Sequence, residues 1–164
     1  MKNDIKVRDP VCEMNVSPGN FDYKYIGNNY SFCSKQCHDR FIANPHLYIG
    51  QPGKPSAKQQ GKTILKCRTL KLDRNIPDDI SRELQLALKK MMGIKQIVIE
   101  NNIIRITYDL LEATAEQIES VISETNEKLS SNWIDKIISA FIHYAEETEL
   151  DNLEEQHSTH KGHC

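Results

Sequence analysis

The chain has 164 residues, with 21 basic and 23 acidic side chains, a formal net charge of -2 and 38% hydrophobic residues. This length suits one ordinary domain or two small ones. The charge lacks the basic excess of a nucleic-acid-binding protein, so no nucleic-acid partner is expected.

The N-terminal residues 1–16 contain no apolar stretch of signal-peptide length. No segment approaches the roughly 18 apolar residues of a membrane span, so we expect none. We therefore expect a cytoplasmic protein, in which thiols stay reduced. The five cysteines are then metal ligands, catalytic groups or core residues rather than disulfide partners.

Residues 1–50 hold three of the five cysteines, namely Cys12, Cys33 and Cys37. Aromatic-rich runs within residues 22–33 predict two short strands, and residues 27–29, Gly-Asn-Asn, predict the turn between them. This hairpin would bring the region of Cys12 back toward the other two cysteines.

A helix is predicted over residues 35–43. Ser34 can cap its N-terminus, and the Asn-Pro pair at 44–45 ends it. Cys33 then lies at the end of a strand and Cys37 in the first helical turn, where free N–H groups favour thiolates. Because so short a segment buries little apolar surface, a bound metal would help it to fold.

Three runs in this segment resemble the YHS domain, part of the TRASH-like group of heavy-metal-binding modules: DPVCEMNV, YKYIGNNYSFCSKQCHDRF and NPHLYIG. The resemblance covers about residues 8–49. It implies a treble-clef-like fold with Cys12, Cys33 and Cys37 as metal ligands, and a link to soft-metal transporters, sensors or larger enzymes. Glu13 stands where the family usually has glycine, and we expect the fold to tolerate it.

Three thiolates suit a soft ion such as Cu(I) or Ag(I) in trigonal geometry, whereas zinc requires a fourth ligand. Candidates for a fourth ligand are Asp9, His38 and His46. His38 is a poor one, because it follows Cys37 on the predicted helix and points about 100° away from it. Two other readings stay open: a metal-free core with reduced cysteines, and a redox pair of Cys33 and Cys37, although the known redox motif has two intervening residues.

Residues 51–62 are rich in Pro, Gly, Lys and Gln, which predicts a flexible linker. Residues 63–130 then predict the order strand, helix, strand, strand, helix. This is the ferredoxin-like plan without its last strand. Together with residues 1–50, it predicts an α+β protein.

In this second domain, Asp78 or Asp79 is expected to cap the first helix, and Gly93 to end it. Thr114 is expected to cap the second helix. The Asn-Asn pair at 101–102 separates the two strands of a hairpin. The predicted core stripes of the helices are Ile80, Leu84, Leu88 and Met91, and Ile118, Val121, Ile122 and Leu129.

Residues 62–128 resemble the heavy-metal-associated domain of copper chaperones and copper ATPases, in the runs LQLALKKMMGIKQIVIENNIIRITYD and TAEQIESVI. The Met-x-Cys-x-x-Cys motif of that family is replaced by DRNIPDD, so metal binding at the usual place is not expected. Like folds pair in that family, which implies a docking surface for a metal transporter or another protein. Cys67, within the predicted first strand, is expected to be a small buried hydrophobe.

Residues 131–150 predict an amphipathic helix whose apolar face runs from Trp133 to Ala145. This face either packs on the rest of the chain or binds a partner subunit. Its acidic flanks argue against a membrane-surface helix. The tail, residues 151–164, either captures and hands over metal or is solvated without function, and its candidate ligands are His157, His160, His163 and Cys164.

The sequence therefore predicts a non-enzymatic protein that binds copper or silver through Cys12, Cys33 and Cys37 for buffering, delivery or tolerance. The alternative is an interaction subunit of a larger assembly, with structural zinc or no metal. A thiol redox enzyme is a third reading, but the sequence shows no nucleotide motif or nucleophile elbow to support it.

Overall fold

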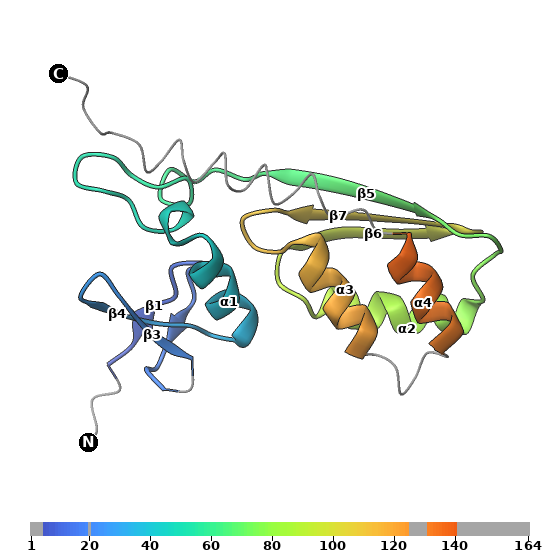
Figure 1. Ribbon diagram of the computed structural model, residues 1–164, viewed down its shortest axis with the longest axis horizontal. Coiled ribbons are helices and arrows are strands. Elements are labelled where there is room, and N and C mark those ends of the chain that lie inside the picture. Colours follow the sequence, from blue (N-terminus) through green and yellow to red (C-terminus); the bar gives the residue numbers. More distant parts are fainter. Residues whose placement is uncertain (1–4, 20, 125–130, 141–164) are drawn as a thin grey trace. The chain divides into compact units, whose positions relative to one another are not determined.

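Figure 1 shows the computed structural model, in which residues 5–19, 21–124 and 131–140 are described. The described chain divides into two compact units, residues 5–63 and residues 64–140. Both contain helices and strands, which confirms the α+β class. The predicted tail ligands lie outside the described residues: His157, His160, His163 and Cys164.

The first unit consists of two small antiparallel sheets followed by a helix. In the first sheet, β1 (Val7–Arg8) pairs with β2 (Asn15–Val16). In the second, β3 (Asp22–Tyr25) pairs with β4 (Asn28–Ser31). Helix α1 (Lys35–Ala43) comes next, and the short 3-10 helix η1 (Pro45–Leu47) follows it.

The β3–β4 hairpin turns one residue earlier than the sequence predicts. Ile26 and Gly27 form the turn, with φ of 46° and 78°, while Asn28 and Asn29 already belong to β4. A two-residue hairpin turn of this kind needs positive φ at both positions, because its twist matches that of the strands. Glycine adopts this conformation freely, and Ile26 adopts it at a steric cost.

Helix α1 begins and ends where the sequence predicts. Ser34 is the N-cap, and its Oγ accepts a hydrogen bond from the N–H of Cys37 at 3.4 Å. Asn44 is the C-cap, and Pro45 opens η1. The local capping signals therefore place Cys37 in the first turn of the helix.

The core of the first unit is an aromatic cluster centred on Phe41. The Phe41 side chain is completely buried. Five rings lie with their centroids 4.9 to 6.3 Å from that of Phe41: Tyr23, Tyr25, Tyr30, Phe32 and Tyr48. Tilted and edge-on ring contacts of this kind add to the stability that burial supplies. They hold α1 against the β3–β4 hairpin.

Residues 51–62 have the composition of a flexible linker but are folded onto the first unit, which corrects the prediction. Ser56 and Ala57 are completely buried. The side-chain oxygen of Gln59 accepts hydrogen bonds from the N–H groups of Gly50 and Ser56 at 3.0 and 2.9 Å. The Gln59 side chain thus satisfies backbone N–H groups at two places, and the segment forms an ordered extension of the unit.

The second unit is a three-stranded antiparallel sheet with three helices on one face (Figure 1). The strands are β5 (Leu65–Lys71), β6 (Ile94–Glu100) and β7 (Ile103–Asp109), in the order β5-β7-β6. The helices are α2 (Asp78–Lys89), α3 (Ala115–Glu124) and α4 (Ser131–Ser139). The order of elements is the predicted one, while the ferredoxin-like assignment stays a prediction. In the described ranges, no helix is long and apolar enough to cross a membrane.

Helix α2 has Pro77 as its N-cap, rather than the predicted Asp78 or Asp79. Both aspartates lie in the first turn, where the helix dipole favours negative charge. Gly93, beyond the end of the helix, has φ of 87°, and a Cβ there would lie 2.9 Å from the Cβ of Ala113. The predicted core stripe is buried as a whole: Ile80, Leu84, Leu88 and Met91.

Helix α3 begins with the predicted cap, Thr114. The Oγ1 of Thr114 accepts a hydrogen bond from the N–H of Gln117, and the Oε1 of Gln117 accepts one from the N–H of Thr114, both at 3.3 Å. This reciprocal capping box satisfies two donors at the helix start. Ile118 and Ile122 are completely buried, Val121 is half-buried, and Leu129 lies outside the described residues.

Helix α4 packs on its own unit through the apolar face that the sequence predicts. Three of its side chains are buried: Trp133, Ile134 and Ile137. The guanidinium of Arg74 lies 4.6 Å from the centre of the Trp133 ring, and Lys136 pairs with Asp73. The described turns are therefore part of the core, and the rest of the predicted face lies outside the described residues: Phe141, Ile142 and Ala145.

Cys67 is exposed, so the prediction that it is a buried hydrophobe is wrong. Side chains alternate between the two faces of β5, and Leu70 is buried on the helix-covered face. Cys67 lies on the other face with Leu65, which is 59% exposed. The sequence reveals the alternation but not which face the helices cover.

Replacing Ile137 with alanine is expected to lower the free energy of unfolding of the second unit by about 2–5 kcal/mol, because it leaves a cavity under α4. Urea unfolding followed by the fluorescence of Trp133, the single tryptophan, measures this. The control is Leu86→Ala on α2, where the side chain is 56% exposed, with an expected change within about 0.5 kcal/mol. Equal effects of the two substitutions would contradict the packing of α4.

Candidate metal centre

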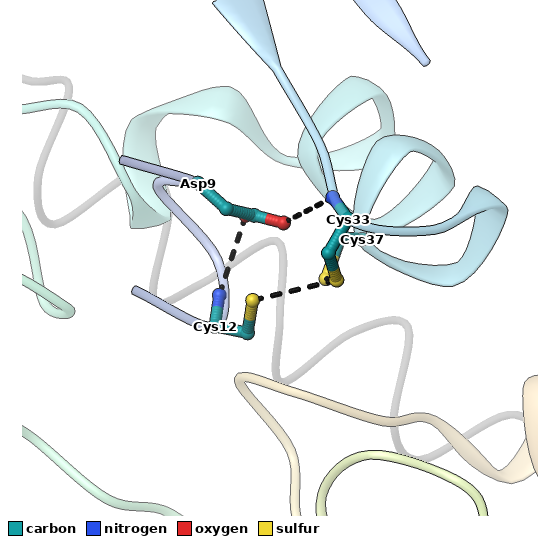
Figure 2. A group of neighbouring side chains, drawn as sticks. All are labelled: Asp9, Cys12, Cys33 and Cys37. Atoms are coloured by element: carbon teal, nitrogen blue, oxygen red, sulfur yellow. Dashed lines mark hydrogen bonds between the residues drawn. The ribbon is translucent and has the colours of Figure 1, made fainter. Parts of the chain in front are cut away.

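Three sulfur atoms meet at the start of α1 (Figure 2). The Sγ of Cys33 lies 3.5 Å from the Sγ of Cys12 and 3.4 Å from the Sγ of Cys37. With a carboxylate oxygen of Asp9, they form a group whose four donor atoms all lie within 4.8 Å of one another. Two sulfurs bound to one zinc ion at about 2.3 Å are about 3.8 Å apart in tetrahedral geometry, so small shifts would accommodate an ion.

Two separate segments supply the sulfurs. Cys33 follows the end of β4 by two residues, and Cys37 is the third residue of α1. Cys12 lies in the tight loop between β1 and β2, which a hydrogen bond from the N–H of Asp9 to the carbonyl of Met14 closes at 2.9 Å. The hairpin thus brings the later cysteines to the loop that holds the first one.

Asp9 lies at the junction of these segments and is completely buried. Its Oδ1 accepts hydrogen bonds from the N–H groups of Val11 at 2.8 Å and Cys12 at 3.4 Å, and its Oδ2 accepts one from the N–H of Cys33 at 2.8 Å. Burial by itself raises the pKa of Asp9, but the hydrogen bonds from Cys33 and Val11 outweigh it, and the pKa lies below its ordinary value. The carboxylate is therefore charged at neutral pH.

The thiols of Cys12 and Cys37 are protonated in the metal-free protein. Burial and the nearby charge of Asp9 raise the pKa of Cys12 to about 12 and the pKa of Cys37 well above its usual range. The sequence predicts a thiolate at Cys37 because it lies at a helix N-terminus, but burial and the carboxylate outweigh the helix dipole. A metal ion must therefore displace thiol protons to bind.

The two histidines proposed as additional ligands lie outside this group of donors. The Nδ1 of His38 lies 3.1 Å from Oδ1 of Asp39, and its ring packs edge-on against Phe32. The Nε2 of His46 lies 3.3 Å from the hydroxyl of Tyr25. Of the three candidates for a fourth ligand, the structure brings only Asp9 to the sulfurs.

Asp9 is a candidate ligand by sequence, but its hydrogen bonds to the backbone were not predicted. One of them leaves a signal in the sequence, because an aspartate often accepts the N–H two residues ahead, as Asp9 does from Val11. The bond from Cys33 leaves no such signal, since Cys33 comes from a distant segment.

Glu13 adopts the left-handed backbone region, with φ of 65°. Its N–H donates to the carbonyl of Asp9 at 2.9 Å, and its carboxylate pairs with Arg8 at 3.1 Å on the surface. Glycine is the residue that adopts this backbone conformation without strain. The structure thus gives a physical reason for the glycine that the YHS resemblance leads us to expect here.

The metal-free protein is expected to lose stability as the pH rises from about 9 to about 12. The thiol of Cys12 ionises near pH 9.0 in an unfolded chain and near 12 in the folded one, so ionisation in this interval favours the unfolded state. Denaturant unfolding across the interval measures the loss. Cys12→Ser removes this thiol and should show a shallower decline, so parallel curves for the two proteins would contradict the assignment.

Replacing Glu13 with glycine is expected to raise the free energy of unfolding of the first unit by up to about 1 kcal/mol, because it relieves the left-handed backbone. Thermal unfolding measures the change. Glu13→Ala is the control, since it removes the ion pair with Arg8 but keeps a Cβ at positive φ. A gain with alanine equal to that with glycine would attribute the effect to the side chain rather than to the backbone.

Comparison with known proteins agrees with this geometry. No curated protein and no solved structure matches the chain. The heavy-metal-associated character of the second unit therefore stays a prediction. The first unit is different: residues 7–52, which include all four donor residues of the candidate centre, match the YHS domain.

Proposed function

We propose that this protein binds a soft metal ion, copper or silver, through Cys12, Cys33 and Cys37, for buffering, delivery or tolerance. The observation that carries the proposal is the meeting of three sulfurs, with neighbouring Sγ atoms 3.4 and 3.5 Å apart. Sets of thiolates select Cu(I) and similar soft ions. The match of residues 7–52 to the YHS domain supports metal binding by this unit.

Capture exchanges protons for the metal ion. Each coordinating thiol gives its proton to the solvent and binds as a thiolate, so affinity rises with pH. Cys12 and Cys33 are half-buried, whereas Cys37 is buried. An incoming ion, or a thiol of a partner, therefore reaches the first two sulfurs before the third. Release proceeds by ligand exchange, in which the partner's ligands replace these sulfurs.

We assign the second unit a docking role rather than an enzymatic one. Its strand order, β5-β7-β6, fits the ferredoxin-like plan without a last strand, the plan that heavy-metal-associated domains share. The loop between β5 and α2 carries no cysteine, so the metal stays with the first unit. A metal transporter or another protein would dock on the second unit in the cytoplasm, where thiols stay reduced.

A structural zinc site in an interaction subunit is the second candidate function. The nearness of Asp9 favours it, because the carboxylate could supply the fourth donor that zinc requires. The metal would then stabilise the first unit, and the function would lie in binding a partner. Ile137 does not belong to such a partner surface, since it is completely buried in its own unit.

Anaerobically purified protein loaded with Cu(I) is expected to hold about one equivalent of copper, because one set of three thiols can bind one ion. Elemental mass spectrometry measures the content. The double variant Cys33→Ser/Cys37→Ser should hold almost none. Cys67→Ser is the matched control, since this exposed cysteine lies in the second unit, and it should bind as the wild type does.

Two other results would change the assignment. Zinc that is present on isolation and is not displaced by Cu(I) would favour the structural site. Wild-type protein without metal even after loading would exclude the ligand role of the three cysteines.

A further inference from the structure

We propose that Asp9 is a positioning residue that holds the Cys12 loop and Cys33 together before a metal ion arrives, and that it is not itself a ligand. This inference rests on metal binding by the three cysteines.

The carboxylate of Asp9 joins segments that lie 24 residues apart in the sequence. Figure 2 shows it above the sulfurs, with bonds to the backbone on both sides. Oδ1 holds the loop through the N–H groups of Val11 and Cys12, and Oδ2 holds the end of the hairpin through the N–H of Cys33. Both segments carry a sulfur, so the carboxylate sets the distance between Cys12 and Cys33.

These hydrogen bonds limit what the carboxylate can offer an ion. A carboxylate oxygen has about two acceptor sites, and two N–H donors already occupy those of Oδ1. Oδ2 accepts the short bond from Cys33, and the thiols of Cys12 and Cys37 also hydrogen-bond to the carboxylate in the metal-free protein. Turning the carboxylate toward an ion would leave N–H donors without their acceptor in a buried place, which is costly. Coordination by the sulfurs alone leaves these hydrogen bonds intact.

The role of Asp9 decides which class of ion suits the site. Three sulfurs without an oxygen form the set that soft monovalent ions prefer. A carboxylate ligand would instead complete the four donors of a zinc site. A carboxylate that positions the sulfurs also lowers the cost of ordering them when the ion binds, because the donors are already close together.

The first test is hydrogen exchange of the metal-free protein, measured by NMR. In Asp9→Asn, the amides of Val11 and Cys33 should exchange at least about tenfold faster, because each loses a charged acceptor. Asp22→Asn is the matched control: Asp22 also accepts a backbone N–H, from Gly19 at 3.0 Å, but on the surface. It should leave both amides unchanged. Wild-type exchange rates in Asp9→Asn would overturn the positioning role.

The second test is X-ray absorption of the Zn(II)-loaded protein, since zinc accepts carboxylate oxygen readily. A first shell without an oxygen supports the proposal, as does an oxygen that persists in Asp9→Ala, because alanine offers no side-chain oxygen and the ligand is then water. An oxygen that disappears in Asp9→Ala would overturn it. If Asp9→Asn does not fold, Asp9→Ser is the second variant, because its hydroxyl can still accept an N–H at this turn.

Failure of the proposed metal binding and failure of the positioning role of Asp9 give different results. Wild-type protein that takes up neither Zn(II) nor Cu(I) would end the proposed function, and hydrogen exchange would still decide whether Asp9 positions the loop. Metal uptake with an Asp9-dependent oxygen would end this inference and leave metal binding intact.

Discussion

The carboxylate of Asp9 is completely buried and accepts hydrogen bonds from backbone N–H groups of two separate segments. A buried charge is tolerable only when such donors compensate it. The donors here belong to the loop that holds Cys12 and to the end of the hairpin that holds Cys33. The loop, the hairpin and the start of α1 are therefore held in one arrangement, and the convergence of the three sulfurs follows from it (Figure 2).

The aromatic cluster around Phe41 supports this arrangement from the other side. Rings from both strands of the hairpin pack against Phe41, which lies one turn beyond Cys37 on α1. So small a unit has little apolar surface to bury. Residues 51–62 add to it, because Ala57 is buried there and the polar side chains bond to the backbone around it. The first unit thus extends beyond the part of the chain that holds the three cysteines.

The protonation states of Asp9, Cys12 and Cys37 depend on one another. Burial and the charge of Asp9 keep Cys12 and Cys37 protonated, so of these three groups only the carboxylate is charged in the metal-free protein. An incoming cation changes this balance, because it replaces protons and compensates the thiolates. Metal binding by this centre would for that reason be coupled to pH.

Much of the fold follows from signals between near neighbours in the sequence. Ser34 caps α1, Thr114 caps α3, and the apolar spacing of α2 predicts its buried stripe. Each depends on groups three or four residues apart, so the sequence alone predicts it. The spacing of the cysteines is also visible in the sequence, although Cys12 lies far from the other two, and it carries the resemblance to the YHS domain.

Tertiary structure determined the features that the sequence did not predict, because burial and distant hydrogen-bond partners are not local properties. It determined that Asp9 rather than His38 or His46 lies beside the sulfurs, and that the thiols of Cys12 and Cys37 hold their protons. It also determined that residues 51–62 fold onto the first unit, and that Cys67 lies on the face of its sheet opposite the described helices. The sequence by itself determined which elements form and which cysteines are available. Only packing determined which side chains are shielded from water, and the chemistry of the centre depends on that shielding.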